Sequence, residues 1–436
     1  MAYDIILGRD KADKKRFGDS GIVRIGKSYV TMGNYTSLSN TLYLDVARSH
    51  VILVAGKRGS GKSYTLGVIT EEISNLPQEV SRNIAPLIFD TMGIFWTMKY
   101  KNEKEKYQLT EWNLEPKSLP IKVFAPIGKM KEYKEKGIPI DSAFALKASE
   151  LEAEDWIVTF NLSMTSQEGV LITNSISQLR NKTDNFTIQD IIKSISQTHN
   201  TNQDTKNIAS ALFQSAESWG IFATSSEGTE ITDLVNAGTT TVLDLSVYSS
   251  IGAFNVRGLV IGLVSRKLFT QRINARKQEE IQSIQHGIDY MSYNPTRDTP
   301  LIWLFIDEAH EFLPRSYKTP ATDALVQILR EGRQPGISLV LATQQPGQIH
   351  QDVMTQADIV IAHRVTAKPD IEALNQIMQT YLLENIKTSL DNLPSSKGSA
   401  IILDDNSERI YPMRMRPRLT WHGGESPASV KGQSNL

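Results

Sequence analysis

Eight residues near the start of the chain have the composition and spacing of a phosphate-binding loop. Residues 56–63 read GKRGSGKS, match the pattern G-x-x-x-x-G-K-[ST], and follow the apolar run 51–55. In such a loop, glycines let backbone N–H groups turn towards phosphate oxygens, and the following helix points its positive end at them. Lys62 would reach the β- and γ-phosphates, and Ser63 would bind Mg²⁺. The alternative is a glycine- and serine-rich surface turn with an incidental lysine. The residues expected around the nucleotide are Gly56, Lys57, Arg58, Gly59, Ser60, Gly61, Lys62, Ser63 and Tyr64.

Two carboxylates follow a second apolar run far along the chain. Residues 301–306 read LIWLFI and are followed by Asp307 and Glu308. A continuous apolar run is typical of a strand buried on both faces, and ligands bind at the carboxyl ends of such strands. Asp307 can therefore hold the Mg²⁺ shell while Glu308 polarises the attacking water. The alternative is a strand that simply ends in an acidic turn.

Two further strand ends carry polar residues. The run 337–343 leads into Gln344 and Gln345, and Gln344 is our candidate to sense the γ-phosphate, with Gln345 in reserve. Either glutamine could instead satisfy backbone groups of a loop. Asp90 ends another expected strand and could orient water or metal, or cap a turn.

Arg330 and Arg333 flank the turn before residues 337–343. An arginine offered to the γ-phosphate of a neighbouring subunit would act as an arginine finger, which requires an oligomer. Both could instead pair with surface carboxylates such as Asp323 or Glu331. Arg364 is a third candidate.

The elements that must position these residues alternate between strands and helices. Such alternation predicts an α/β fold with a largely parallel sheet covered by helices. A helix is expected over 321–331, and Thr187 and Asp190 have the spacing of a capping box. The expected strands are Pro86–Asp90, Ile121–Ala125, Thr239–Leu245, Leu301–Ile306, Ile337–Thr343 and Ala357–Ala362.

The chain of 436 residues is long enough for two or three domains or for one elaborated sheet. Short β-like pieces punctuated by glycines, including Gly26, indicate a small N-terminal β module, reduced and barrel-like. A polar helical segment indicates an inserted subdomain, and residues 270–299 are expected to be a helix end and a solvated loop. The expected divisions are 1–48 (β module), 49–126 (first part of the core), 127–237 (insert), 238–420 (rest of the core) and 421–436 (tail).

Composition limits the function classes. The net charge is −1, so any contact with nucleic acid must be local. A basic cluster at Lys11, Lys14, Lys15 and Arg16 could be such a contact or a solvated loop. The chain has no cysteine, which excludes disulfides and thiolate metal sites, and it has no apolar run long enough to cross a bilayer. A cytoplasmic protein is expected.

These pieces, in this order, resemble the HerA/FtsK branch of P-loop ATPases, and most closely the HerA-type hexameric DNA translocases. The resemblance covers about residues 50–424 and rests on GKRGSGKS, LIWLFIDEAHEFLP, LREGRQPGISLVLATQQP and MRPRLTWHGG. It implies a RecA-like core, a homohexameric ring with ATP and Mg²⁺ between subunits, double-stranded DNA in the pore, and a partner nuclease of the NurA type.

Carried over by position, the resemblance supports Lys62 and Ser63 at the phosphates and Mg²⁺, Asp307 and Glu308 at the metal and water, and Gln344 as sensor. It also supports an arginine at 330–333 acting in trans. The chain departs from the family in two places. Its N-terminal module is short, and Asp90-Thr91-Met92-Gly93-Ile94 stands where relatives have an Asp-Pro-His-Gly-Glu type of sequence.

Three functions fit these features. The first is a ring motor that hydrolyses ATP and translocates double-stranded DNA in end processing or defence. The second is a nucleotide-gated scaffold that controls an effector nuclease without moving DNA. The third, a conjugation or packaging pump, is less favoured because no membrane segment is present.

Overall fold

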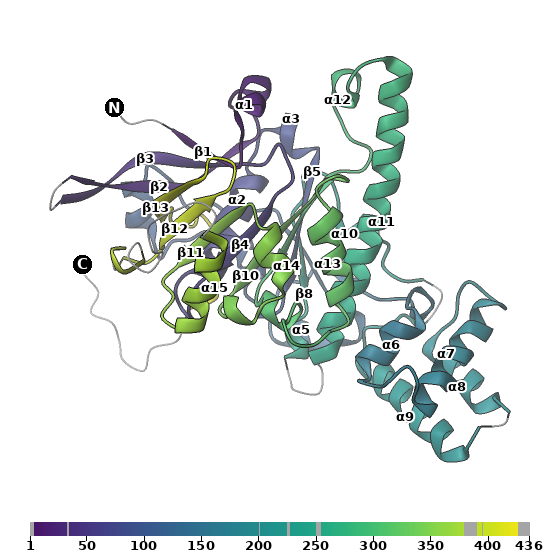
Figure 1. Ribbon diagram of the computed structural model, residues 1–436. Helices are drawn as coiled ribbons and strands as arrows, with labels where there is room; N and C mark the ends of the chain where they lie inside the picture. The colour runs from purple at the N-terminus through teal and green to yellow at the C-terminus, as the bar shows by residue number, and fades with distance from the viewer. Residues whose placement is uncertain are drawn as a thin grey trace.

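One continuous sheet organises the protein. The computed structural model describes residues 4–32, 35–199, 201–224, 227–249, 254–378, 390–394 and 396–425. Within these residues thirteen strands form a single sheet in the order β1-β3-β2-β13-β12-β11-β4-β10-β9-β5-β8-β6-β7 (Figure 1). The strands are β1 Ile5–Leu7, β2 Ile22–Met32, β3 Tyr35–Asp45, β4 Val51–Ala55, β5 Ile84–Asp90, β6 Lys122–Pro126, β7 Ser142–Phe144, β8 Thr241–Asp244, β9 Leu301–Ile306, β10 Ile337–Thr343, β11 Ile359–His363, β12 Ser399–Asp404 and β13 Arg409–Met415.

The strands from β11 to β7 in that order run parallel to one another. We call the side of the sheet where these strands end the carboxyl edge, and the side where they begin the amino edge. Each strand expected from the sequence is present, with bounds that differ by no more than two residues. The predicted α/β fold with a largely parallel sheet is confirmed.

Helices cover both faces of this sheet. Helix α2 packs its Leu66 and Ile69 against one face, with Val54 and Phe305 of the strands. The other face is covered by α11, α13 and α14 (Figure 1). No helix in the described ranges is long and apolar enough to cross a membrane. The helices are α1 Lys11–Phe17, α2 Lys62–Ser74, α3 Gln78–Ser81, α4 Lys106–Glu111, α5 Met130–Glu135, α6 Ala153–Thr159, α7 Gln167–Arg180, α8 Ile188–Gln197, α9 Gln203–Ser218, α10 Ile231–Leu234, α11 Phe254–His286, α12 Tyr290–Tyr293, α13 Thr322–Glu331, α14 Gln351–Gln356 and α15 Lys368–Met378.

Within residues 127–237, predicted as a helical insert, only α6 to α9 project from the sheet, at the lower right of Figure 1. The predicted bounds are too wide, because β7 in the same segment is a strand of the main sheet. The core of the projecting part is aromatic, since the ring of Trp156 lies 4.9 Å from that of Phe213 and 5.2 Å from that of Phe222. The capping box at the start of α8 is confirmed, with Thr187 accepting the N–H of Asp190 and Asp190 accepting that of Thr187. A stable local core and a capped helix let this segment fold as an appendage of the sheet.

Two expectations about local structure are wrong. Gly26 does not mark a turn but lies inside β2, where a side chain would meet the carbonyl oxygen of Arg414 at 2.4 Å. Only glycine permits β13 to approach β2 so closely. The basic cluster at Lys11, Lys14, Lys15 and Arg16 lies on helix α1 and not in a loop. Residues 270–299 are, as expected, a helix end followed by a loop, because α11 continues to His286 and only the short α12 interrupts the residues after it. The polar composition of this stretch reflects the exposed end of a long helix.

A buried charge network at the amino edge joins the N-terminal strands to the core. The Nδ1 atom of His50 lies 2.7 Å from Oδ2 of Asp358, and its Nε2 atom lies 3.4 Å from Oδ2 of Asp45. Asp45 also pairs with Arg9, and Asp358 with Arg333. Burial lowers the pKa of His50, but the hydrogen bonds to Asp358 and Asp45 outweigh it and raise the pKa to about 9. His50 is therefore charged at neutral pH.

This network predicts that stability falls in mildly alkaline solution. The pKa of His50 is higher in the folded protein than its ordinary value of 6.5, so its contribution is complete below pH 6.5 and is lost as the pH rises through 9. The contribution is on the order of 3 kcal/mol. We expect the melting temperature to fall between pH 6.5 and 9.5, and to fall much less in the variant His50→Gln. Equal pH dependence in both proteins would contradict the assignment.

Candidate nucleotide site

The phosphate loop is held between strand ends at the carboxyl edge. The N–H groups of Gly56 and Lys57 donate to the carbonyls of Thr343 and Arg364, at 3.2 and 3.1 Å. Gly61 has a φ of +112°, a backbone conformation that favours glycine, and α2 begins at the next residue. The start of the loop is therefore anchored beside the ends of β10 and β11, and its other end leads into α2.

The two nucleotide motifs meet in space. Oγ of Ser63 donates to Oδ2 of Asp307 at 2.5 Å, although the residues are 244 positions apart. Lys62 is buried, and its Nζ donates to the carbonyl of Lys57 at 3.3 Å across the loop. Asp307 lies at the end of β9 and is fully buried. The structure thus places a lysine ammonium, a serine hydroxyl and a carboxylate around one point.

Glu308 is held in an unusual conformation beside them. Its φ is +51°, a left-handed backbone value that is uncommon for residues other than glycine. Nε2 of Gln344 donates to Oε1 of Glu308 at 3.1 Å. The other oxygen, Oε2, is buried and accepts no hydrogen bond from a described residue. Gln344 is therefore next to Glu308, whereas Gln345 is exposed.

The electrostatics of the site reflect burial. Burial lowers the pKa of Lys62, against the opposing charges of Glu308 and Asp307. Burial raises the pKa of Asp307, and burial together with the charge of Asp307 raises the pKa of Glu308 to about 7. A carboxylate with a pKa close to the working pH is suited to accepting a proton.

Two histidines that were not anticipated line the same site. Nδ1 of His310 lies 3.2 Å from Oγ1 of Thr343 and 3.6 Å from Oε2 of Glu308. His363 ends β11, where its Nε2 lies 2.8 Å from Oγ1 of Thr65 in α2. Burial, followed by the charge of Lys62, lowers the pKa of His310 to about 4, and burial lowers that of His363 to about 4. Both histidines are therefore neutral at pH 7. Their positions, close after or at the end of a buried strand, are the sequence feature from which their place in the site could have been predicted.

These residues fit a triphosphate with a divalent cation. The hydroxyl oxygen of Ser60 is buried in the loop without a hydrogen-bond partner among the described residues, as is Oε2 of Glu308. Phosphate oxygens and a water molecule would supply those partners. No group of three or more histidines and carboxylates forms a closed metal cage in the described ranges. A cation would therefore be held by Ser63 and Asp307 together with phosphate and water, as is usual for Mg²⁺.

Asp90 caps a turn. Its carboxylate accepts the N–H groups of Gly93 and Phe95, each at 2.7 Å. It lies opposite Asp244 of β8, and burial with the charge of Asp244 raises the pKa of Asp90 to about 7. These hydrogen bonds explain the position of the Asp90 carboxylate as a turn cap, and no contact with water or metal is needed to explain it.

The arginine candidates lie in two different places. Arg330 pairs with Asp352 at 2.7 Å and Arg333 with Asp358 at 2.8 Å, and both precede β10 at the amino edge. Within one chain they are therefore on the side of the sheet away from Lys62, and they have the carboxylate partners that were weighed as the alternative. Arg364 follows β11 at the carboxyl edge, is exposed, and forms no ion pair with a described residue.

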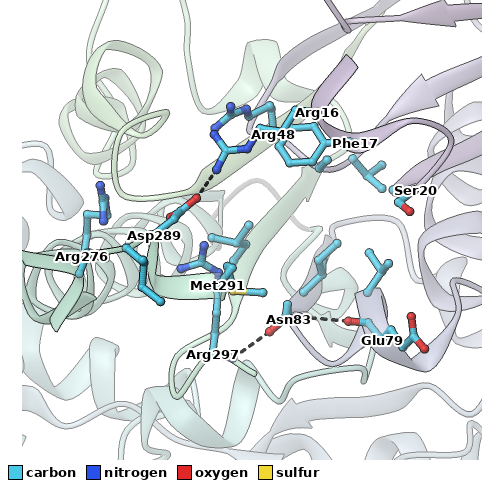
Figure 2. A pocket seen from close by; sticks show the side chains of 18 of the residues that line it. Arg16, Phe17, Ser20, Arg48, Glu79, Asn83, Arg276, Asp289, Met291 and Arg297 are labelled. Carbon is cyan, nitrogen blue, oxygen red and sulfur yellow. Dashed lines mark hydrogen bonds and ion pairs between the residues drawn. The ribbon is translucent and has the colours of Figure 1, made fainter. Parts of the chain in front are cut away.

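A separate cavity of about 870 Å³ lies at the amino edge, between α1, α3 and the distal end of α11 (Figure 2). Its lining includes Arg16, Arg48, Arg276 and Arg297. Arg16 pairs with Asp289 and Arg297 contacts Asn83 through its backbone (Figure 2). The cavity is thus distinct from the nucleotide site and lies at the opposite edge of the sheet.

Comparisons with known proteins agree with this geometry. A family model described as Helicase HerA, central domain, matches residues 24–261, and one described as Zonular occludens toxin matches residues 249–379. The chain is 28% identical over 185 residues to a probable DNA double-strand break repair helicase HerA of Methanocaldococcus jannaschii, covering 39% of this chain and 36% of that protein. It is 27% identical over 145 residues to the DNA double-strand break repair helicase HerA of Pyrococcus furiosus, covering 32% and 24%. The matches thus span about a third or less of these relatives.

A solved structure shares the fold. VirB4 of Thermoanaerobacter pseudethanolicus superposes with a TM-score of 0.55 at 12% identity, covering 91% of this chain and 96% of that one. At this identity the likeness concerns the fold alone. The HerA model, by contrast, covers more than half of the chain, including the phosphate loop. The chain therefore belongs to the HerA family of P-loop ATPases.

Proposed function

We propose that this protein hydrolyses ATP, with Mg²⁺, to translocate double-stranded DNA as a homohexameric ring. The observation that carries the hydrolytic part is the convergence of Ser63 and Asp307, 2.5 Å apart, beside Lys62 and Glu308. Family membership and the relatives described as DNA repair helicases support DNA as the substrate. We extend this proposal to a protein that acts together with a partner nuclease of the NurA type, in DNA end processing or defence.

The residues would divide the work as follows. Lys62 offsets the charge of the terminal phosphates, and the N–H groups of the loop bind their oxygens. Glu308 accepts a proton from the attacking water, while Gln344 holds the Glu308 carboxylate in place. When bound, Mg²⁺ would neutralise charge that develops on the phosphate oxygens, with Ser63 and Asp307 as its protein contacts.

A neighbouring subunit would complete the site with an arginine. Arg330 and Arg333 remain our candidates, since in a head-to-tail ring each subunit presents to its neighbour's nucleotide a different part of its surface from the one that holds its own Lys62. Arg364, exposed beside the loop, is the third. Mass measurement of the protein with a non-hydrolysable ATP analogue should give six copies, and a monomer under those conditions would exclude an arginine acting in trans.

Two measurements test the motor proposal. Double-stranded DNA should stimulate the ATPase at low salt, and the moving protein should displace a labelled roadblock from the DNA. Stimulation without displacement would instead favour a nucleotide-gated scaffold that controls an effector nuclease. Absence of stimulation at low salt would rule out DNA as the substrate.

The contact between Gln344 and Glu308 predicts a difference between two adjacent glutamines. The change Gln344→Ala removes the amide that holds Glu308, and we expect kcat to fall by about 10- to 100-fold. The matched control Gln345→Ala should change kcat by less than about threefold, because its side chain is exposed. Steady-state phosphate release would measure both, and equal effects would exclude the proposed role of Gln344.

A further inference from the structure

We propose that a surface of exposed aromatic rings and lysines at the carboxyl edge binds unpaired nucleotides of single-stranded DNA. We define this aromatic–lysine surface by Trp96, Tyr100, Lys101, Lys106 and Trp421. The proposal rests on the proposed function in one respect, namely that DNA is the substrate. It goes further by assigning the residues and the form of DNA that they bind.

The aromatic part brings together two segments that are distant in sequence. Residues 100–101 and 420–421 pair as antiparallel backbone, with a bridge between Lys101 and Thr420 and a hydrogen bond from the N–H of Trp421 to the carbonyl of Tyr100 at 2.8 Å. Tyr100 and Trp421 are therefore cross-strand neighbours, whose side chains leave from the same face. Tyr100 is 50% exposed and Trp421 is 40% exposed.

Further contacts hold the two segments that carry these rings in place. The ring of Trp96 lies 6.1 Å from that of Tyr100 in an edge-to-face arrangement, and its Nε1 donates to the carbonyl of Gly93 at 2.8 Å. The hydroxyl of Thr97 donates to the carbonyl of Trp421 at 3.0 Å. Exposed aromatic side chains on a fixed backbone are a platform on which bases can stack, since every base has a flat face.

The same region carries the local positive charge that DNA binding requires. Residues 99–106, which adjoin the rings, contain four lysines and two glutamates, and Lys99 and Lys104 pair with Asp141 and Glu425. Lys101 and Lys106 are exposed and form no ion pair with a described residue. Lys134 of α5, which follows β6 at the same edge of the sheet, is also exposed and unpaired within the described part of the chain. Phosphates of a strand lying on the rings would meet these ammonium groups.

The surface is linked to the nucleotide site by direct contacts. His422, next to Trp421, lies edge-on to Tyr64 with ring centres 5.3 Å apart, and Tyr64 follows Ser63 in α2. The hydroxyl of Tyr64 donates to Glu105, which adjoins Lys106. These contacts join the surface to the start of α2.

Single-stranded DNA fits this surface better than intact duplex does. Stacking requires the faces of bases, and a duplex buries these faces between its base pairs. A surface that bound only phosphates would need lysines but would not need exposed aromatic rings. The rings of Tyr100 and Trp421 thus select unpaired nucleotides, such as those at a frayed DNA end.

The test is binding of fluorescently labelled oligo(dT) and of a labelled duplex to the full chain, followed by anisotropy. The change Tyr100→Ala should weaken oligo(dT) binding by about tenfold and duplex binding much less, whereas Tyr100→Phe should keep the affinity. The double change Lys101→Gln/Lys106→Gln should make the salt dependence of oligo(dT) binding shallower by about 1.4 in log–log slope. The control Lys182→Gln/Lys193→Gln removes two exposed lysines of the helical appendage, one after α7 and one in α8, and should bind like the parent.

The outcomes separate this inference from the proposed function. If the parent protein binds neither DNA, both proposals fall. If it binds DNA but the Tyr100 and Lys101/Lys106 variants bind oligo(dT) normally, only this inference is wrong. Loss of binding in the Lys182/Lys193 variant, or an equal loss for duplex and single strand in Tyr100→Ala, would likewise overturn it. Unchanged melting temperature and basal ATPase would show that the variants are folded.

Discussion

Replacing Glu308 with glutamine is expected to lower kcat for ATP hydrolysis by at least about 100-fold while ATP still binds. Glutamine keeps the size of the side chain and can still contact Gln344, but it cannot accept a proton from water. Binding should persist because Lys62 and the loop N–H groups are unchanged. Phosphate release measures turnover, and a fluorescent ATP analogue measures affinity.

Glu311 provides a matched control for this experiment. It lies on the same short turn, three residues after Glu308, and its carboxylate pairs with Arg257 at 3.0 Å. The change Glu311→Gln should therefore alter kcat by less than about threefold. Turnover in Glu308→Gln equal to that of the parent would remove Glu308 from the proposed chemistry.

Loss of Glu71 is expected to destabilise the fold by about 3–5 kcal/mol. Its carboxylate, fully buried in α2, pairs with Arg416 at 2.9 Å and Arg418 at 3.2 Å, and both arginines are fully buried. It also accepts the N–H groups of Leu419 and Thr420, each at 3.0 Å. The change Glu71→Ala would leave two guanidinium groups buried, and Glu72 would remain as a carboxylate partner of Arg416 but not of Arg418.

Thermal unfolding would measure this effect, which we expect as a fall of several degrees in melting temperature. An exposed ion pair gives the control, since Glu132 pairs with Lys136 at 2.8 Å on the surface of α5. The change Glu132→Gln should cost less than about 0.5 kcal/mol. Equal melting temperatures for the Glu71 and Glu132 variants would show that the buried network does not secure the C-terminal segment.

Local sequence was sufficient to predict the elements with strong patterns. The run 301–306 is apolar at every position and forms β9, and GKRGSGKS leads into α2 at Lys62. The meeting of Ser63 and Asp307 was predictable because parallel strands bring their carboxyl ends to one edge. These inferences need only the pattern of one segment and a general rule of sheet geometry.

Other features depend on partners that no local pattern reveals. β12 and β13 were not predicted, and β13 pairs with β2, nearly four hundred positions earlier. The sequence placed Arg333 near a strand but did not predict its contact with Asp358. It also did not predict that His50 lies between the carboxylates of Asp358 and Asp45. The roles of Gln344 and of the arginine in trans remain predictions, because the first concerns catalysis and the second concerns a neighbouring subunit.

The place of β13 has a consequence for shortened versions of the protein. β13 forms hydrogen bonds with β12 on one side and with β2 on the other. A chain that started at the phosphate-loop strand would leave that second side of β13 open, and an open strand invites pairing with another molecule. β2 thus covers this side of β13, and a different N-terminal module would need a strand that pairs with β13 in the same way.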